Sequence, residues 1–229
     1  MNLTHDSYQY KVLRQSLKSG KHNGAYYYSK EIVKNIIPAV KTDRPWVTIR
    51  VGDLAYDHAI VFIHKNVHLE TYQFLSKYKD LILVCSNHDT AHHLQQLGKT
   101  IFIPMNVDVK YVEKFKLPEH DRENVYCGNK WSFKKRDLDW WLPKNCDTLT
   151  NLPRKEMLTE MAHYKKVYAV GRCAIEAKIL GAELGFCDSR YPDTSFWKVV
   201  DNSEAAQMLQ QFLNYYDKGE SNGYEEENF

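Results

Sequence analysis

The sequence predicts an α/β fold with parallel sheets. Two short runs, residues 59–64 (AIVFIH) and 81–85 (LILVC), are continuously apolar, which is typical of strands that helices cover on both faces. Residues 167–186 (VYAVGRCAIEAKILGAELGF) combine a β-type run, a glycine turn, a segment with apolar residues at helical spacing and a second β-type run. This alternation of strands and helices in both halves of the chain indicates the α/β class.

The N-terminal half is predicted to alternate helices with strands. A turn signal at His22-Asn23-Gly24 precedes the first helix. That helix has four apolar residues on one face, namely Tyr28, Ile32, Ile36 and Val40. Asn87 is a candidate N-cap, and Gly98 a candidate end, of a later helix. The expected helices are 25–40, 70–78 and 88–97, and the expected strands are 45–51, 59–64, 81–85 and 100–103.

The second half has the same alternation after a polar passage. Residues 111–123 are polar with one proline, which is typical of a linker. Gly181 is placed where a helix ends in the left-handed region. Residues 218–229 are polar and acidic and are expected to be disordered. The expected strands are 124–127, 147–149, 166–170 and 183–186, and the expected helices are 155–163, 173–180 and 201–216.

Length, net charge and cysteine content limit the classes of protein to which this chain can belong. At 229 residues the chain is long enough for one domain or two small ones. A net charge of +2 supplies no bulk electrostatic reason to expect a nucleic-acid partner. The sequence shows no signal-peptide pattern and no apolar run of membrane-spanning length, so no transmembrane segment is expected. Five cysteines without a C-x-x-C pair predict reduced thiols in a cytoplasmic protein.

One acidic residue, Glu176, lies near the N-terminal turn of the helix expected at 173–180. Free backbone N–H groups point outward at such a turn, where phosphates and sugar hydroxyls are often bound. A carboxylate there can accept two hydroxyl hydrogen bonds at once. It can equally stabilise the helix macrodipole, and both interpretations stay open.

Residues 20–217 resemble GT-B glycosyltransferases in the order of their elements and in short motifs. Glu176, Ala177 and Gly181 match the E-A-x-x-x-G helix of that family, and residues 104–108 (PMNVD) resemble its P-N-G-V-D passage between domains. The resemblance implies two Rossmann-like domains with parallel sheets that face a cleft, and 81–85 and 166–170 as central strands of two separate sheets. The implied domains are 1–110 on the acceptor side and 111–217 on the nucleotide-sugar side, followed by a polar tail at 218–229.

The resemblance also implies a binding site for a nucleotide-sugar, such as a UDP- or GDP-sugar, with no metal or other cofactor. Cations would neutralise the donor diphosphate, the loop at Leu152 would meet the base, and a histidine at a strand end would contact the sugar phosphate or transfer a proton. The residues implied for donor binding are Gly24, Gly128, Lys130, Lys135, Leu152, Arg172 and Glu176, and the implied catalytic residues are His64 and Glu176.

Each of these assignments has a structural alternative. The basic run Lys134, Lys135 and Arg136 is also what a solvated surface or a contact with nucleic-acid phosphates would show. His64 is equally explained as a strand-end histidine bonded to the backbone. His88 and His92 have zinc-ligand spacing, with His93 adjacent, but no clear third ligand accompanies them.

An Asp-Leu-Asp motif at 137–139 matches the D-x-D of metal-dependent GT-A glycosyltransferases. In that family the motif follows an apolar strand, whereas here it follows three basic residues and precedes two tryptophans. The sequence therefore favours a metal-independent transferase.

The primary interpretation is a glycosyltransferase that moves a sugar from a nucleotide-sugar to an unknown acceptor. The alternative is a catalytically degenerate GT-B-like protein that binds a nucleotide or a macromolecule. Ala169 and Tyr168 occupy the positions where the family has a second glutamate, which favours this alternative. A sugar transferase directed at DNA is a third interpretation, and the near-neutral charge argues against it.

Overall fold

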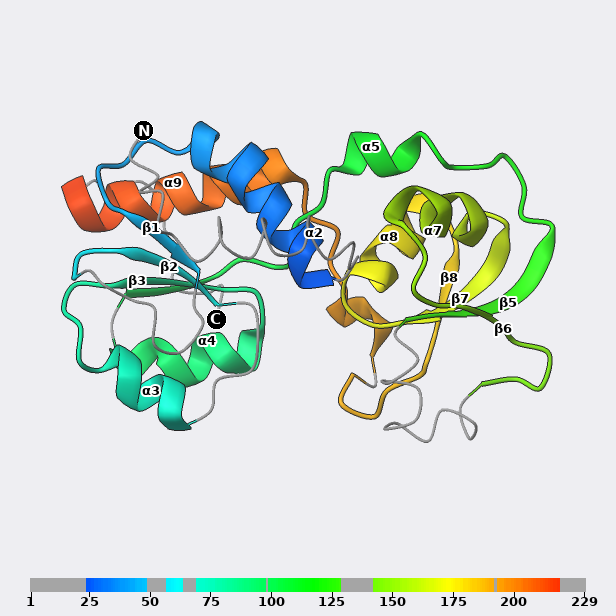
Figure 1. Ribbon diagram of the computed structural model, residues 1–229, viewed down its shortest axis with the longest axis horizontal. Helices are drawn as coiled ribbons and strands as arrows, with labels where there is room; N and C mark the ends of the chain where they lie inside the picture. The colour runs from blue at the N-terminus through cyan, green and yellow to red at the C-terminus, as the bar shows by residue number, and fades with distance from the viewer. Residues whose placement is uncertain are drawn as a thin grey trace. The chain divides into compact units, whose positions relative to one another are not determined.

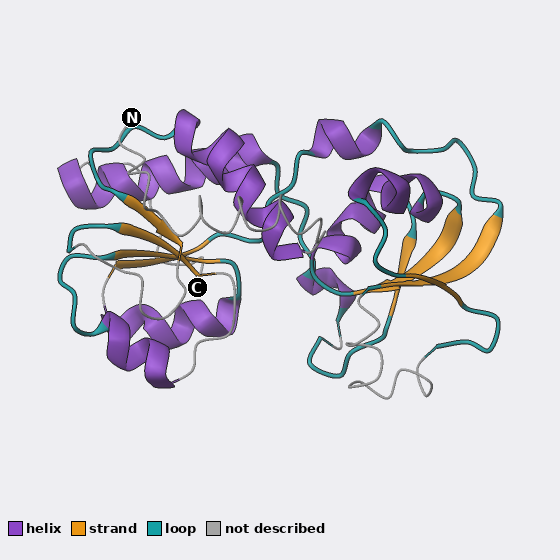
Figure 2. Cartoon of the chain, in the orientation of Figure 1, coloured by secondary structure: helices purple, strands orange, loops and turns teal. Residues whose placement is uncertain are grey.

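The computed structural model contains two separate four-stranded parallel sheets, each with helices packed on it (Figures 1 and 2). The chain divides into two compact units, the first built from described residues of 25–106 and 202–218 and the second from those of 107–201 together with Gly24. Each unit is an α/β structure with Rossmann-like parallel strands. The residues that the structure describes are 24–48, 57–63, 69–97, 99–128, 142–191 and 193–218.

The first sheet has its strands in chain order, β1-β2-β3-β4, and every neighbouring pair is parallel. All residues of β2 and β3 are buried, as their continuously apolar sequences predicted. Figure 1 shows α3 and α4 on one face of this sheet and α2 and α9 on the other. The strands are β1 (Trp46–Thr48), β2 (Ile60–Ile63), β3 (Ile82–Cys85) and β4 (Lys99–Phe102), and the helices between them are α3 (Leu69–Leu75) and α4 (His88–Leu94).

The helix expected at 25–40 is built from three successive helical types. It begins as α2 (Gly24–Glu31), continues as the π-helical segment η1 (Ile32–Ile36) and ends as the 3₁₀ segment η2 (Ile37–Ala39). Pro38 lacks an N–H donor and cannot continue an α-helical ladder, which accounts for the end of the helix here. The apolar face is buried as predicted, since Tyr28, Ile32, Ile36 and Val40 are all in the core.

The last helix, α9 (Asn202–Lys218), belongs to the first unit. It packs against η1 and η2 and buries one apolar side, made of Ala205, Ala206, Leu209, Phe212 and Leu213. This division differs from the expected one, in which 202–217 belonged to the second domain and the first domain ended at residue 110, because the first segment of the first unit ends at Asn106 and α9 forms its second segment. The amides of Asn106 and Asn202 hydrogen-bond at 2.6 Å where the chain leaves and re-enters this unit.

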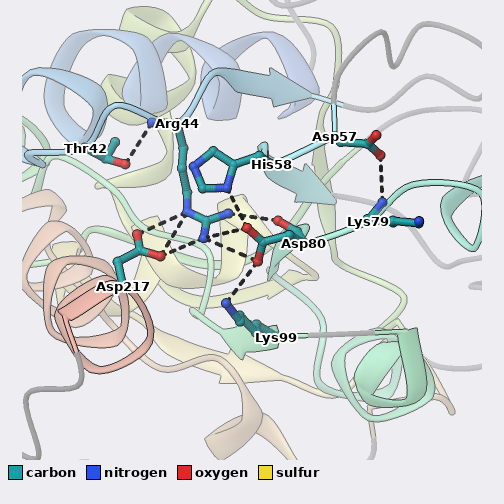
Figure 3. A network of polar contacts seen from close by, with 8 residues as sticks. All are labelled: Thr42, Arg44, Asp57, His58, Lys79, Asp80, Lys99 and Asp217. Atoms are coloured by element: carbon teal, nitrogen blue, oxygen red, sulfur yellow. Dashed lines mark hydrogen bonds and ion pairs between the residues drawn. The ribbon is translucent and has the colours of Figure 1, made fainter.

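A network of charged side chains lies at the amino ends of the strands of the first sheet (Figure 3). Arg44, His58 and Asp80 precede β1, β2 and β3, and Lys99 begins β4. The guanidinium of Arg44 contacts both Asp80 and Asp217, the latter in the last turn of α9. These bonds connect α9 to the edge of the sheet opposite the carboxyl ends of its strands.

The second sheet has the order β6-β5-β7-β8, again with all pairs parallel. Residues 81–85 and 166–170 were predicted to be central strands of separate sheets, and β3 and β7 confirm this. Helices α7 and α8 pack side by side on one face of the sheet (Figure 1). The strands are β5 (Arg122–Cys127), β6 (Asp147–Leu149), β7 (Tyr164–Ala169) and β8 (Glu183–Gly185), and the helices are α7 (Arg154–Met161) and α8 (Arg172–Leu180).

The passage expected as a linker at 111–123 is part of the second unit. It overlaps the short helix α5 (Val109–Glu113), whose N-cap Asp108 accepts a hydrogen bond from the Tyr111 N–H at 2.9 Å. Val112 is fully buried, and α5 packs against α8. A single buried residue in a polar passage is too weak a periodic signal to predict such a helix.

Candidate functional site

The predicted site residues divide into those that the structure describes and those that it does not. His64, Lys130 and Lys135 lie outside the described residues, as do Lys134, Arg136 and the motif at 137–139. Gly24 is the first residue of α2. The second unit contains the four others, which are Gly128, Leu152, Arg172 and Glu176.

These four residues follow the carboxyl ends of strands in the second sheet. Gly128 comes directly after β5, Leu152 lies between β6 and α7, and Arg172 begins the helix that follows β7. Because the strands are parallel, their carboxyl ends share one edge of the sheet, and ligands of open α/β sheets bind at that edge. The structure thus places these four residues along the edge expected to bind a ligand.

At two positions along this edge, the local structure explains why the residue is a glycine. Gly171, between β7 and α8, has φ 65° and ψ −135°, a conformation that essentially only glycine adopts. It allows the chain to turn from the strand directly into the helix, with Arg172 as the first helical residue. A Cβ at Gly128 would lie 2.5 Å from the hydroxyl oxygen of Tyr126, so this glycine is explained by packing against that ring.

The loop between β6 and α7 has a constrained backbone. Asn151 has φ 57°, in the left-handed region that asparagine tolerates better than most residues. Leu152 is half-buried, and Pro153 is the N-cap of α7. Arg154 is therefore the first residue of its helix, as Arg172 is of α8.

Glu176 joins these two arginines. Its Oε1 accepts hydrogen bonds from Nε of Arg172 at 2.8 Å and from Nε of Arg154 at 3.1 Å. The Glu176 side chain is only 3% exposed, and those of Arg172 and Arg154 are 5% and 12% exposed. Charged groups are rarely buried to this extent unless they are paired. We call Arg154, Arg172 and Glu176 the arginine–glutamate cluster.

The ring of Tyr111 contributes a further contact to this cluster. The guanidinium carbon of Arg154 lies 5.0 Å from the centre of that ring. Guanidinium groups stack on aromatic faces through cation–π attraction, and stacking restricts the orientation of the guanidinium plane. Three helices, α5, α7 and α8, thus position the Arg154 side chain.

The arginine–glutamate cluster differs from the arrangement expected for Glu176. The sequence predicted hydroxyl groups of a ligand as its partners, whereas the partners observed in the structure are two guanidiniums. Arg154 was not among the predicted site residues. The Arg172–Glu176 pair has the i, i+4 spacing that sequence alone can identify, but Arg154 is 22 positions from Glu176 and carries no such signal.

Two cysteines near the cluster are poor nucleophiles. Burial raises the pKa of the Cys173 thiol to about 12, although Arg172 and Arg154 act in the opposite direction. Burial likewise raises the pKa of Cys127 well above its usual value. Only a thiolate is strongly nucleophilic, so neither side chain is suited to covalent catalysis at neutral pH.

Two of the three histidines on α4, His88 and His93, contact protein groups. The ring of His88 packs edge-on against Phe102, and Nδ1 of His93 lies 2.6 Å from the backbone oxygen of Asp89. Among the residues that the structure describes, no group of three His, Cys, Asp or Glu side chains is arranged to hold a metal ion. None of the helices in the same ranges has the length and apolarity needed to cross a membrane.

Comparisons of this chain with models of known protein families, with curated proteins and with solved structures gave no match. Its function is therefore inferred from the residues and their geometry.

Proposed function

We propose that this chain is a metal-independent glycosyltransferase that transfers a sugar from a nucleotide-sugar, and that the donor phosphates bind beside the arginine–glutamate cluster. In this proposal the two units are the halves of a GT-B-like enzyme, with the acceptor bound by the first and the donor by the second. The observation that carries it is the placement of Arg154 and Arg172 at the first positions of α7 and α8, at the carboxyl edge of the second sheet.

Three properties of that placement suit a diphosphate. The planar fork of a guanidinium matches two oxygens of a phosphate. The first turn of a helix presents backbone N–H groups and the positive end of the helix dipole. A nucleoside diphosphate gains negative charge as the bond to the sugar breaks, so cations held in place at this position lower the barrier without a metal ion.

The proposal also assigns roles to predicted residues. Lys130 and Lys135 would add positive charge to the diphosphate site, the loop at Leu152 would meet the base, and His64 would serve the reacting sugar. Gly24 would take part in donor binding. These assignments derive from the resemblance of the sequence.

A second candidate function is nucleotide binding without sugar transfer. Two observations favour it. The Glu176 carboxylate is buried and bonded to two arginines, an environment unlike that of a carboxylate that receives sugar hydroxyls. Ala169, at one of the positions where the family has its other glutamate, is the buried last residue of β7 and carries no polar group.

A panel of UDP- and GDP-sugars separates the two functions. A ligand that binds only the folded state raises the melting temperature by mass action, so thermal shift detects binding, and release of the nucleoside diphosphate detects turnover. We expect at least one nucleotide-sugar to do both. A thermal shift without any turnover, with or without added sugar and glycan acceptors, would favour the second function, and the absence of any shift would contradict both.

Arg122→Ala is a matched control for Arg154→Ala in this assay. Both residues are arginines of the second unit. Arg122, however, lies at the amino end of β5, opposite the carboxyl ends of the strands, and pairs with the exposed Glu160 at 3.0 Å. We expect Arg154→Ala to abolish the thermal shift caused by the nucleotide-sugar and Arg122→Ala to retain it.

A further inference from the structure

The two hydrogen bonds to Glu176 share one geometric feature. Each arginine donates through Nε, the nitrogen nearest the aliphatic stem, and both bonds end on the same oxygen, Oε1. The terminal fork of each guanidinium, formed by Nη1 and Nη2, is not the part that makes these bonds. The carboxylate therefore holds both arginines by the base of their head groups.

We infer that Glu176 is a positioning residue, which orients the guanidiniums of Arg154 and Arg172 toward a phosphate and does not itself contact the sugar or the ribose. The inference rests on the phosphate site of the proposed function, and not on the transfer of sugar. It replaces the role in which Glu176 accepts ligand hydroxyls.

Burial supports this role. With 3% of its side chain exposed, Glu176 has little surface left for a ligand to reach, and Arg172 is nearly as buried at 5%, so Arg154, at 12%, is the most accessible member of the cluster. An arginine side chain has many rotamers, and a ligand that binds mobile arginines must first restrict them. Glu176 holds both side chains, and Tyr111 additionally restricts Arg154, before any phosphate arrives.

Charge alone predicts the opposite effect for a change at Glu176. Its carboxylate is negative and lies close to the proposed phosphate, so replacing it with a neutral amide would strengthen anion binding if nothing else changed. Positioning predicts weaker binding, because a neutral amide oxygen accepts weaker hydrogen bonds from the two Nε–H groups than a carboxylate oxygen does. The sign of the change in affinity therefore separates the two effects.

The test is calorimetric titration of wild type and Glu176→Gln with two kinds of probe. Inorganic pyrophosphate reports the phosphate site, and uridine and guanosine report contacts with the base and ribose. We expect Glu176→Gln to weaken pyrophosphate binding by about tenfold, which corresponds to renewed mobility of two arginine side chains, and to leave nucleoside binding unchanged. Glu160→Gln, which breaks an arginine–glutamate pair at the other edge of the same sheet, should change neither.

A double-mutant cycle tests whether Glu176 acts through the arginines. In an Arg154→Ala background the loss caused by Glu176→Gln should shrink, since one of the two side chains to be positioned is already gone. Glu176→Asp provides a second variant if the glutamine variant does not fold. Its carboxylate is one methylene shorter and cannot reach both Nε atoms without a shift, so it too should weaken pyrophosphate binding.

Three outcomes would overturn the inference. Nucleoside binding that weakens while pyrophosphate binding is retained would show that Glu176 contacts hydroxyls. Tighter pyrophosphate binding would show that only its charge matters. A wild-type protein that binds neither pyrophosphate nor UDP nor GDP would remove the phosphate site itself. If pyrophosphate binding responds as expected but no sugar is transferred, the transferase proposal fails and the positioning role of Glu176 stands.

Discussion

Nη2 of Arg44 lies 2.6 Å from Oδ1 of Asp217, a residue 173 positions later in the chain. The same guanidinium donates to the backbone oxygen of Asp80 at 2.8 Å and approaches its carboxylate. The Arg44 side chain is 1% exposed and that of Asp217 is 30% exposed, so a buried guanidinium connects the last helix to the start of the first sheet. It accounts for how α9 is held in the first unit at its C-terminal end.

Arg44→Ala should destabilise the first unit. The change removes the bonds to Asp80 and Asp217 and leaves a cavity in place of a buried guanidinium, at a cost of roughly 2–4 kcal/mol in the free energy of unfolding. Urea denaturation followed by circular dichroism measures this loss. The exposed Lys41→Ala is the control and should leave the transition unchanged. A midpoint for Arg44→Ala equal to that of wild type would show that α9 does not depend on this connection.

Asp80 should make the stability of the first unit sensitive to acid. Burial acts to raise its pKa, but hydrogen bonds from His58 and Lys99 and the charge of Arg44 outweigh this and lower the pKa from 3.8 to about 2. Because the folded state favours the charged carboxylate, the stabilisation is fully present above the unfolded pKa and is lost as the pH falls from there through about 2.

Asp80→Asn isolates that contribution. The variant should be less stable than wild type at pH 7, and the difference between the two urea midpoints should shrink steadily as the pH is lowered below the ordinary aspartate range. A difference that stays constant down to the lowest pH at which both variants fold would mean that the charge of Asp80 is not what stabilises the fold.

Gly171→Ala should affect both stability and ligand binding. A Cβ at φ 65° and ψ −135° costs about 1–3 kcal/mol, and relief of this strain would move Arg172 at the start of α8. Gly181→Ala is a matched control, since Gly181 also has a positive φ, of 89°, but ends the same helix. We expect both variants to unfold earlier and only Gly171→Ala to lose affinity for UDP or GDP, as measured by calorimetry.

Arg172→Ala should lower kcat more strongly than Arg172→Lys. If the guanidinium stabilises charge on the leaving diphosphate, its removal should cost about 10²–10³-fold in kcat, as with other transition-state donors. Lysine keeps the charge but not the fork and should retain part of the rate. Steady-state kinetics with the best donor of the panel, with folding checked by circular dichroism, provides the measurement, and equal rates for all three proteins would exclude Arg172 from the site.

Several features of the fold were predictable because they depend on neighbouring residues. The side chain of Asn87 accepts from the Thr90 N–H at 3.0 Å and caps α4 as predicted, and Gly181 ends α8 in the left-handed region. The buried strands β2 and β3 were recognisable because every residue in them is apolar. Interactions within a few positions, or properties shared by a whole run, can be identified in a sequence without knowing the fold.

Such patterns predicted that α9 is a helix but not which unit it packs against. Its apolar stripe predicted a helix with one buried side, and this is confirmed. An apolar stripe does not specify which surface covers it, because the hydrophobic effect is non-directional. Only the folded chain pairs that stripe with η1 and η2, and pairs Asp217 with Arg44, and thereby assigns the helix to the first unit.

The candidate site likewise has one part that the sequence predicts and one part that depends on tertiary packing. By itself the sequence determined the glycine turn at Gly171 and the helix that follows it, and the i, i+4 spacing of Arg172 and Glu176 is visible there, although the sequence had predicted ligand groups as their partners. The third member of the cluster was decided by tertiary structure, because Arg154 meets Glu176 only when α7 and α8 lie side by side on one face of the second sheet. Hydrogen bonds between side chains act over about 3 Å, so a partner on another helix depends on how the helices pack, which local sequence does not encode.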